Sequence, residues 1–442
     1  MQTRCLCAAL LVYAAAFLPA QQNPPVLGNP SAPAQVLRLD DLVRIALEKD
    51  PEAQSALHTV KALEHHVSQA AALPDPTVAV GWAGNPAPFS IMSRDASSYR
   101  GVTVSEQFPA RGKLKLQKEM ASKDVEAAKA DYGAVCRRVA ADLKAAFYDY
   151  FYFDKALQAT NQNKVLLEKL SAIAEAQYRV GQSSQQDVLR SQVEVSMLIE
   201  KLTMLQLQKV TAQARINAFL QQPVDSPLPP PEELQPSPLR FTLDELSALA
   251  AKNDAAIQRD ETMIGKQNLG VALARKQYRP DIGVSYMYQQ RADHPDMNGL
   301  TVSVNIPVFY KAKQRPAIAE ASENALSAEK LRDNRLNEIH FELRQQYLAL
   351  KAAERLMSLY RTGIVPQSSL ALESSMSAYQ VGKTDFLSLI SNFNTVLDYQ
   401  SNYFRQLADY KTAIARIESL TGVAIASPEP AILALQPAGK GL

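Results

Sequence analysis

Several features common in enzymes and nucleic-acid-binding proteins are missing from this sequence. It contains three cysteines, five histidines and one tryptophan in 442 residues. Cys5 and Cys7 lie in the N-terminal segment, so Cys136 alone remains beyond it and no internal disulfide can form there. The 47 Lys and Arg residues nearly balance the 45 Asp and Glu residues, without a basic run, which argues against a nucleic-acid partner.

Motifs that bind nucleotides or support catalysis are also missing. There is no glycine-rich dinucleotide or phosphate loop, no Cys-x-x-Cys pair and no Gly-x-Ser-x-Gly turn. The histidines lack the three or four convergent ligands of a zinc site, so we interpret two short groups as solvated helix faces: His58, Glu64, His65 and His66, and Glu338, His340 and Glu342. We therefore predict no enzymatic activity, no cofactor and no metal site.

The N-terminus has the layout of a secretory signal peptide. A basic start precedes an apolar core from Leu6 to Leu18, and Pro19-Ala20 opens a polar stretch. That core is shorter than the ~20 residues that span a bilayer, and no longer apolar run follows it. We expect residues 1–20 to be a signal peptide, residues 21–36 to be a proline-rich segment, and the exported protein to have no transmembrane helix.

The sequence contains an internal repeat. Leu39-Asp40-Asp41-Leu42 recurs as Leu243-Asp244-Glu245-Leu246, and Tyr178-Arg179-Val180-Gly181 recurs as Tyr379-Gln380-Val381-Gly382. Two further matches lie between these in the same order, and all the shifts are between 198 and 204 residues. The pattern predicts two copies of one structural unit.

The repeat fixes the expected domain boundaries. We expect a first repeat at 37–222 and a second at 239–424, followed by a flexible tail at 425–442. Between the repeats, residues 223–238 include seven prolines, which favour a stiff and extended linker.

Each repeat is expected to contain a helix, two strands and a long helical hairpin. Alternation of apolar and polar residues predicts strands at about 77–84, 101–108, 281–289 and 299–308. The apolar rows are Val78, Val80 and Trp82; Val102, Val104 and Phe108; Ile282, Val284, Tyr286 and Tyr288; and Leu300, Val302, Val304 and Ile306. Prolines cost least where helix and strand meet, and four of them are expected at such joints: Pro76, Pro109, Pro280 and Pro307.

The long helices have the spacing of coiled coils. Apolar residues that follow Phe386 step by three and four as far as Ile417, and similar rows follow Leu336 and Leu198. This spacing is typical of a left-handed coil. Between about residues 112 and 222 we expect one brief break near Thr160 to Asn163 and a loop around Gly181.

Four strands per chain raise the question of how their edges are completed. The smallest membrane barrels have about 8 strands, and an open edge in lipid leaves backbone groups unpaired. If one apolar face lies in lipid, other copies of the chain must supply the missing strands. A soluble β-layer packed on helices is the alternative.

The combined pattern resembles the TolC-type outer-membrane efflux proteins, over about residues 36 to 423. The likeness rests on the duplicated halves, the strand pair within each half, and the Tyr-x-x-Gly stretch followed by polar residues and Asp-Val-Leu. Leu73-Pro74-Asp75-Pro76 and the segment from Phe108 to Lys113 are most similar to the branch that serves heavy-metal resistance–nodulation–division pumps.

The resemblance implies a mainly α fold with a small β part. Three chains would form a twelve-stranded barrel in the bacterial outer membrane and a tunnel of coiled-coil helices, an α-barrel, across the periplasm. The expected partners are two other copies, outer-membrane lipid, a periplasmic adaptor protein and an inner-membrane resistance–nodulation–division-type pump. The expected function is passive export of small molecules or metal ions. A periplasmic coiled-coil scaffold or adaptor is the alternative.

The resemblance also suggests functional positions. The stretches from Tyr178 to Asp187 and from Tyr379 to Ser391 would form the periplasmic tip, with candidate gate residues Tyr178, Gly181, Asp187, Tyr379, Gly382 and Asp385. The tip aspartates are either carboxylate rings or parts of solvated turns. Trp82, Tyr286 and Tyr288 are either membrane-interface aromatics or ordinary strand-packing residues.

Overall fold

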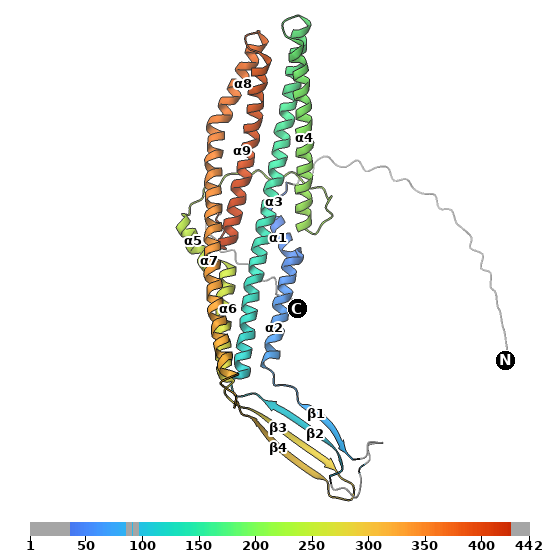
Figure 1. The fold of residues 1–442 in the computed structure, drawn as a ribbon. Coiled ribbons are helices and arrows are strands. Elements are labelled where there is room, and N and C mark those ends of the chain that lie inside the picture. Colours follow the sequence, from blue (N-terminus) through green and yellow to red (C-terminus); the bar gives the residue numbers. More distant parts are fainter. Residues whose placement is uncertain (1–35, 85–90, 92–96, 426–442) are drawn as a thin grey trace, which may run out of the picture. The chain divides into compact units, whose positions relative to one another are not determined.

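The computed structural model describes residues 36–84, 91 and 97–425. The expected signal peptide at 1–20, nearly all of the segment at 21–36 and nearly all of the tail at 425–442 lie outside these residues. In chain order the elements are α1 (Leu39–Lys49), α2 (Pro51–Ala71), β1 (Thr77–Ala83), β2 (Tyr99–Phe108), α3 (Lys113–Arg179), α4 (Gln185–Phe219), α5 (Leu243–Asn253), α6 (Ala255–Lys276), β3 (Asp281–Gln290), β4 (Met297–Asn305), α7 (Gln314–Leu359), the π-helix η1 (Tyr360–Ile364), α8 (Val365–Gln380) and α9 (Phe386–Thr421) (Figure 1).

Both repeats begin with two helices that meet at an aspartate. Asp50 caps α2 by accepting hydrogen bonds from the amides of Glu52 and Ala53, at 2.9 and 3.0 Å. Asp254 caps α6 in the same way, from Ala256 at 2.8 Å and Ile257 at 3.1 Å. A capping carboxylate satisfies amides that have no partner inside the helix, so the aspartate fixes where the second helix starts.

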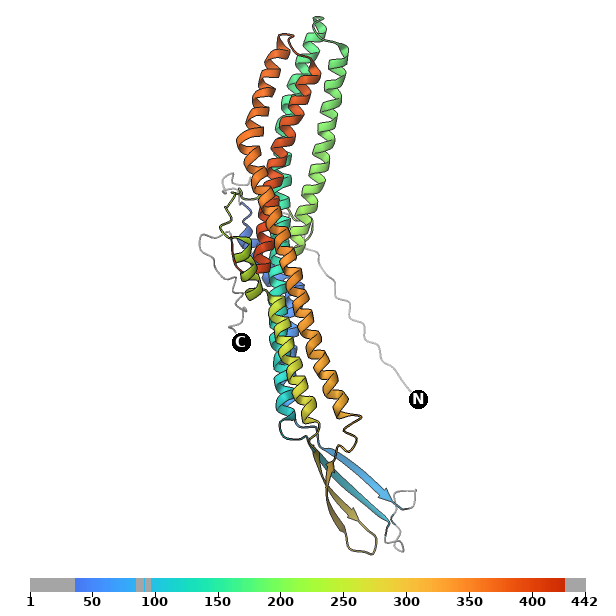
Figure 2. The same cartoon turned by 60° about the vertical axis from the view of Figure 1, so that its left-hand side comes forward.

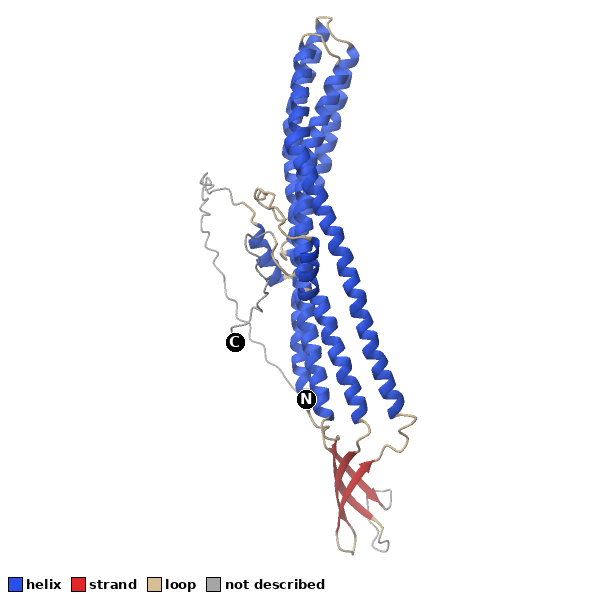
Figure 3. Cartoon of the chain, turned by 90° about the vertical axis from the view of Figure 1, so that its left-hand side faces the viewer, coloured by secondary structure: helices blue, strands red, loops and turns tan. Residues whose placement is uncertain are grey.

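The four strands form one antiparallel sheet in the order β1-β2-β3-β4. The two repeats meet in its centre, where β2 pairs with β3 from Arg100↔Gln290 to Phe108↔Ile282. The sheet joins the helices at the end remote from the turns that connect α3 to α4 and α8 to α9 (Figure 2). In space, the strands therefore lie together at one end of the helices, although the two kinds of element alternate in the sequence (Figure 3).

The long helices pack through the apolar rows that the sequence predicts. On α9, Phe386, Leu389 and Phe393 are buried near one end, and Tyr410, Ile414 and Ile417 near the other. The α3 helix contacts α2, α4, α6 and α9, while α7 packs on α6 and α9. The prediction of a mainly helical fold with long coiled-coil helices and four strands is confirmed.

The break expected near Thr160 to Asn163 is wrong. The α3 helix runs without interruption through these residues. Thr160 is buried, and the Asn163 side chain donates to the carbonyl of Ala159 and to the Gln400 side chain of α9, at 2.8 and 3.2 Å. The Asn163 side chain is satisfied by these bonds, whereas the Thr160 hydroxyl has no hydrogen-bond partner among the described residues. Neither residue ends the helix, because packing of α3 on α4 and α9 overrides the local preference of polar side chains.

The proline-rich segment between the repeats packs along the helices. The Tyr150 hydroxyl donates to the carbonyls of Leu228 and Pro229, both at 3.3 Å. In the second repeat, the Tyr410 hydroxyl donates to the carbonyl of Ser237. One buried tyrosine from each repeat thus supplies a hydrogen bond to backbone that proline-rich sequence leaves without ladder partners.

Among the described residues, no helix is both long enough and apolar enough to cross a membrane. Within the same ranges, no three histidine, cysteine, aspartate or glutamate residues are grouped so that they could hold a metal ion.

Candidate functional sites: an exposed sheet face and two helix turns

One face of the sheet presents mostly apolar side chains, interrupted by Glu106 between Val104 and Phe108, and we call it the apolar sheet face. The strand register aligns them in rows, and one row runs across all four strands through Val78, Val104, Tyr286 and Leu300. The face comprises Val78, Val80, Trp82, Val102, Val104, Phe108, Ile282, Val284, Tyr286, Tyr288, Leu300, Val302 and Val304. The opposite face carries small and polar residues such as Thr103, Ser285 and Thr301.

The apolar sheet face is open over much of its area. Val80 is 82% exposed and Leu300 is 72% exposed, and no helix of the described chain covers them. The two outer strands are also open, because β1 pairs only with β2 and β4 only with β3 among the described residues. Exposed apolar edges of this kind invite pairing with another chain, and soluble proteins normally protect them.

The three aromatic residues predicted for a membrane interface all lie on the apolar sheet face. Trp82, Tyr286 and Tyr288 are between 41% and 50% exposed. The Tyr286 hydroxyl donates to Asn298 at 2.7 Å, and the Tyr288 hydroxyl donates to Asp296 at 2.6 Å. The tyrosine rings therefore sit on apolar surface while their hydroxyls hydrogen-bond toward the β3–β4 loop, an arrangement that suits a boundary between lipid and water.

The four predicted joint prolines flank the strands. Pro76 and Pro280 directly precede β1 and β3, and Pro109 directly follows β2. Pro307 follows a β4 strand that ends at Asn305, earlier than the expected 308. At that end the Val308 amide bonds the Ile306 carbonyl in a tight turn, so the backbone leaves the ladder before the apolar alternation stops.

At the other end of the helices are two short turns, residues 180–184 in the first repeat and 381–385 in the second. Gly181 and Gly382 have φ values of 73° and 71°. In the first turn the Gln182 amide bonds the Gln177 carbonyl at 2.8 Å, and in the second the Lys383 amide bonds the Ala378 carbonyl at 2.8 Å. Both are glycine-terminated helix ends, in which the left-handed residue lets the chain fold back and satisfy the last carbonyls.

The two predicted tip carboxylates do not occupy equivalent positions. Ser184 is the N-cap of α4: its hydroxyl accepts a hydrogen bond from the Asp187 amide at 3.2 Å, and its own backbone amide donates to the Asp187 carboxylate at 3.4 Å. In the second repeat Asp385 is itself the N-cap of α9, with Ser388 three residues later. The Ser388 hydroxyl lowers the pKa of the Asp385 carboxyl, which also interacts with backbone amides. Serine and aspartate have exchanged places, so the two carboxylates lie one helical turn apart in the repeat register.

The repeated tyrosines also have different surroundings. Tyr178 is 45% exposed, whereas Tyr379 is 4% exposed and packs on the Phe386 ring with centroids 5.5 Å apart. Burial, together with the nearby Asp187 carboxylate, raises the pKa of the Tyr379 hydroxyl. Of the six predicted gate residues, the structure therefore brings Asp187 of the first turn close to Tyr379 of the second.

Gln177 links the turns and was not singled out from the sequence. Its side-chain amide donates to the carbonyls of Tyr379 and Gln380 at 3.2 and 3.4 Å, which ties the end of α3 to the end of α8. The repeat register places Ala378 at the corresponding position of the second half. This difference within an otherwise repeated stretch was the one signal that could have identified Gln177.

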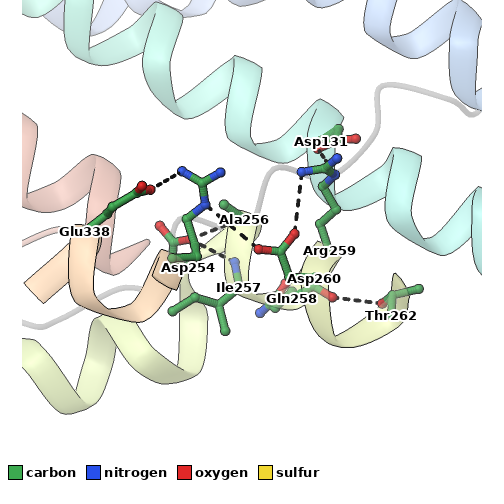
Figure 4. Close-up of polar contacts among 10 residues, drawn as sticks. Asp131, Asp254, Ala256, Ile257, Gln258, Arg259, Asp260, Thr262 and Glu338 are labelled. Atoms are coloured by element: carbon green, nitrogen blue, oxygen red, sulfur yellow. Dashed lines mark hydrogen bonds and ion pairs between the residues drawn. The ribbon is translucent and has the colours of Figure 1, made fainter. Parts of the chain in front are cut away.

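A polar network also joins the repeats in the middle of the helices. Arg259 of α6 lies 3.3 Å from Asp131 of α3 and 3.5 Å from Asp260 (Figure 4). Burial raises the pKa of Asp131, and Arg259 partly offsets that effect. Arg335 of α7 continues the network, 3.9 Å from Asp260 and 2.7 Å from Glu338. Local sequence spacing does not indicate these contacts, because the partners come from three different helices.

Comparison with known proteins gives a match to a family model over part of the chain and a shared fold over most of it. Residues 42–220 match the family model described as outer membrane efflux protein. No curated protein matches the sequence.

Several solved structures have the same fold. The outer membrane protein VceC of Vibrio cholerae is 17% identical, with a TM-score of 0.75, and the match covers 87% of this chain and 96% of that one. The CmeC outer membrane channel of Campylobacter jejuni is 12% identical, with a TM-score of 0.73, and the match covers 87% of this chain and 85% of that one. The MtrE outer membrane channel of Neisseria gonorrhoeae is 16% identical, with a TM-score of 0.67, and the match covers 88% of this chain and 89% of that one.

These identities are low, so the structural likeness shows the fold alone. That fold fits the exposed apolar sheet face, the long helices and the two capped turns. Residues 42–220 match the family model of outer membrane efflux proteins, and the described chain has the same fold as these solved outer-membrane channel structures.

Proposed function

We propose that the protein is the outer-membrane channel subunit of a tripartite efflux system and acts as a passive conduit. The observation that carries this proposal is the apolar sheet face, which is exposed on four strands whose two outer edges are open. The apolar rows suit contact with lipid, and the polar rows on the other face suit a water-filled interior.

The open edges argue for several copies in one assembly. Each unpaired backbone group in hydrocarbon costs several kcal/mol, so a single four-stranded sheet cannot be stable in a membrane. Three copies supply twelve strands, with β4 of one copy beside β1 of the next. Cyclic symmetry then closes the sheet and leaves no edge. We therefore propose a homotrimer whose strands lie in the lipid of the outer membrane.

The helices give the assembly its reach. The 67 residues of α3 correspond to a length of about 100 Å at ~1.5 Å per residue. We propose that they extend into the periplasm, where the turns at 180–184 and 381–385 meet a periplasmic adaptor and, through it, an inner-membrane pump. The segments from Leu73 to Pro76 and from Phe108 to Lys113 favour a pump of the heavy-metal resistance–nodulation–division branch, with small molecules or metal ions as cargo.

We propose further that Asp187 and Asp385 influence cation passage at the periplasmic end. In a symmetric trimer Asp187 contributes three like charges, and so does Asp385. Because the two aspartates occupy different positions in their repeats, they form two separate rings of charge. Like charges ~8 Å apart at an effective dielectric of ~20 repel by about 2 kcal/mol, so a divalent cation between them is favoured.

Single-channel recording tests this role for the carboxylates. Asp187→Asn and Asp385→Asn, alone and combined, should weaken block by divalent cations in a graded way. Glu175→Gln, at an exposed carboxylate paired with Arg179 on the same helix, is the matched control. Block that is the same in the double variant and in the wild type would show that the aspartates serve only as helix caps.

The channel itself is tested by fractionation and conductance. We expect the full chain to enter the outer-membrane fraction, to migrate as a trimer that heating converts to monomer, and to form ion-conducting pores in planar bilayers. A coiled-coil scaffold or adaptor in the periplasm would instead be released by osmotic shock and would not conduct. That result would refute the channel function.

A further inference from the structure

The junction between the sheet and the helices carries an unusual surface, which we call the junction surface. It consists of residues 275–281, from the end of α6 to the start of β3, and residues 305–315, from the end of β4 to the start of α7. It directly continues the apolar sheet face and is separate from the helix turns at the remote end of the helices (Figure 1).

The first component of the junction surface is apolar. Ile306 and Val308 continue the alternation of β4 beyond the strand, and each is 69% exposed. Phe309 is 80% exposed, although a phenyl ring gains most by leaving water. The rings of Tyr310 and Tyr278 pack nearby at a tilt of 49°, with centroids 6.1 Å apart. Aromatic rings beside an apolar band are typical of the lipid–water boundary.

The second component is positive charge. Lys276, Arg279, Lys311, Lys313 and Arg315 belong to the same two segments as these rings. Within the described part of the chain, the ion pair at this junction is between Lys113 and Asp281, at 2.7 Å, and the same carboxylate accepts the Ala110 amide at 2.6 Å. Because the Asp281 carboxylate is already paired with Lys113, it does not neutralise the other cations, and the junction surface carries an excess of positive charge.

A cavity of about 450 Å³ brings the two components together. Arg279, Lys313, Phe309 and Ile306 line it, together with Gln314. The Gln314 side-chain oxygen is buried and has no hydrogen-bond partner among the described residues. A buried acceptor without a partner indicates that a donor is missing, since such groups are normally satisfied.

We propose that this cavity binds the headgroup of a phospholipid. Arg279 and Lys313 contact the phosphate, the Gln314 oxygen accepts a hydrogen bond from a hydroxyl or ammonium of the headgroup, and Phe309 and Ile306 contact the start of the acyl chains. This inference rests on the proposed function in one respect, because it requires the sheet to lie in a membrane. Charge complementarity favours phosphate over a second copy of the chain.

The test uses the full chain purified in a neutral detergent. Dioctanoyl phosphatidylglycerol is titrated, and binding is followed by native mass spectrometry and by the shift in melting temperature. Inorganic phosphate and dioctanoylglycerol are titrated in parallel, because each carries only half of the proposed recognition. The test variant is Arg279→Gln with Lys313→Gln.

The matched control is Arg344→Gln with Arg355→Gln. These two arginines are exposed on α7, and Arg344 lies about 45 Å along the helix from its start at ~1.5 Å per residue. The control removes the same amount of charge at a distance from the junction surface, and circular dichroism verifies that both double variants keep their helix content.

We expect the wild type and the control to bind the phospholipid equally and the test variant to bind it at least about tenfold more weakly. Equal binding by the test variant would overturn the proposal. Binding of inorganic phosphate as tight as that of the lipid would also overturn it, because it would indicate a free-anion site. Equally tight binding of dioctanoylglycerol would overturn it too. Loss of trimer with unchanged lipid affinity would assign the surface to a second copy.

These outcomes separate the inference from the proposed function. A protein that conducts in planar bilayers while the test variant binds phospholipid normally would overturn only the headgroup site. A protein that forms no pore while Arg279 and Lys313 still determine phospholipid binding would overturn only the channel.

Discussion

The two repeats have the same construction wherever the chain must satisfy its own backbone. Asp50 and Asp254 cap the second helix of each repeat with the same pair of hydrogen bonds. Gly181 and Gly382 end the following long arms with nearly the same φ. The arms themselves are equal in length, since α3 and the segment from α7 through α8 both span 67 residues. Caps, glycines and arm length are local requirements that each copy must meet independently.

The repeats differ in the middle of their long arms and at the helix turns. The α3 arm is continuous, but the second arm contains η1, in which the Val365 amide bonds the Tyr360 carbonyl five residues back. Pro366 follows it, and the repeat register places Val165 at the corresponding position of α3. Proline has no amide hydrogen and its ring clashes with the preceding turn, so the helix widens there.

The turns show the same divergence. The exposed Tyr178 corresponds to the buried Tyr379, and the Ser184–Asp187 pair corresponds to Asp385 and Ser388 in reversed order. The two repeats therefore share their backbone construction and differ in individual side chains.

The largest effect is expected where the repeats should behave alike, on the apolar sheet face. Val80→Lys in the first repeat and Val302→Lys in the second both place a charge on the exposed apolar row. Each should cost about 2–4 kcal/mol per chain in a bilayer and abolish trimer insertion, as seen by loss of heat-modifiable migration. Thr103→Lys and Thr301→Lys, on the polar face, are the controls and should insert. Normal insertion of the valine variants would contradict a lipid-facing role.

The next effect tests the difference between the arms. Val165→Pro copies the second-repeat residue into α3 and should destabilise the protein by about 3 kcal/mol, because the continuous helix has no widened turn to receive it. Pro366→Val makes the reciprocal change and should cost less than about 1 kcal/mol. Thermal unfolding monitored by circular dichroism measures both. Equal losses would show that Pro366 does not cause η1.

A smaller and symmetric effect is expected at the helix ends. Gly181→Ala and Gly382→Ala should each cost about 1 kcal/mol, because alanine disfavours positive φ and nothing lies within 4 Å of the added carbon at either site. Hydrogen exchange should become faster in the mutated turn alone. Clearly different losses of stability in the two variants would mean that the turns are not equivalent in backbone strain.

The smallest effect concerns pH. Burial raises the pKa of the Asp254 carboxyl, with the amides of Ile257 and Ala256 and the charge of Arg137 opposing it. Between the ordinary aspartate value and this raised value the folded state binds more protons than the unfolded state, so stability should fall as pH rises through that window. Asp254→Asn keeps a capping oxygen and should remove this pH dependence. The free energy of unfolding should change by less than about 1 kcal/mol. Urea unfolding at several pH values measures it, and Asp50→Asn is the equivalent-site control.

The sequence predicted much of the fold because its signals are local and periodic. The strands, the coiled-coil rows and the glycine-terminated turns each follow from spacing within a few residues. The break expected at Thr160 to Asn163 was placed in the wrong repeat, because polar residues were read as helix-ending while Pro366 was not considered. The candidate gate and interface residues could be located along the chain, but their roles stay predictions.

The amino-acid sequence by itself determined the duplication, the alternating apolar rows and the glycine positions, since these depend on the backbone preferences of neighbouring residues. Tertiary structure decided that β2 pairs with β3 between the repeats, that Tyr379 is buried while Tyr178 is not, and that Gln177 joins the two turns. It also placed Arg279, Lys313 and Gln314 around one cavity. These contacts join residues far apart in the chain, and local spacing carries no information about which distant partner a side chain will meet.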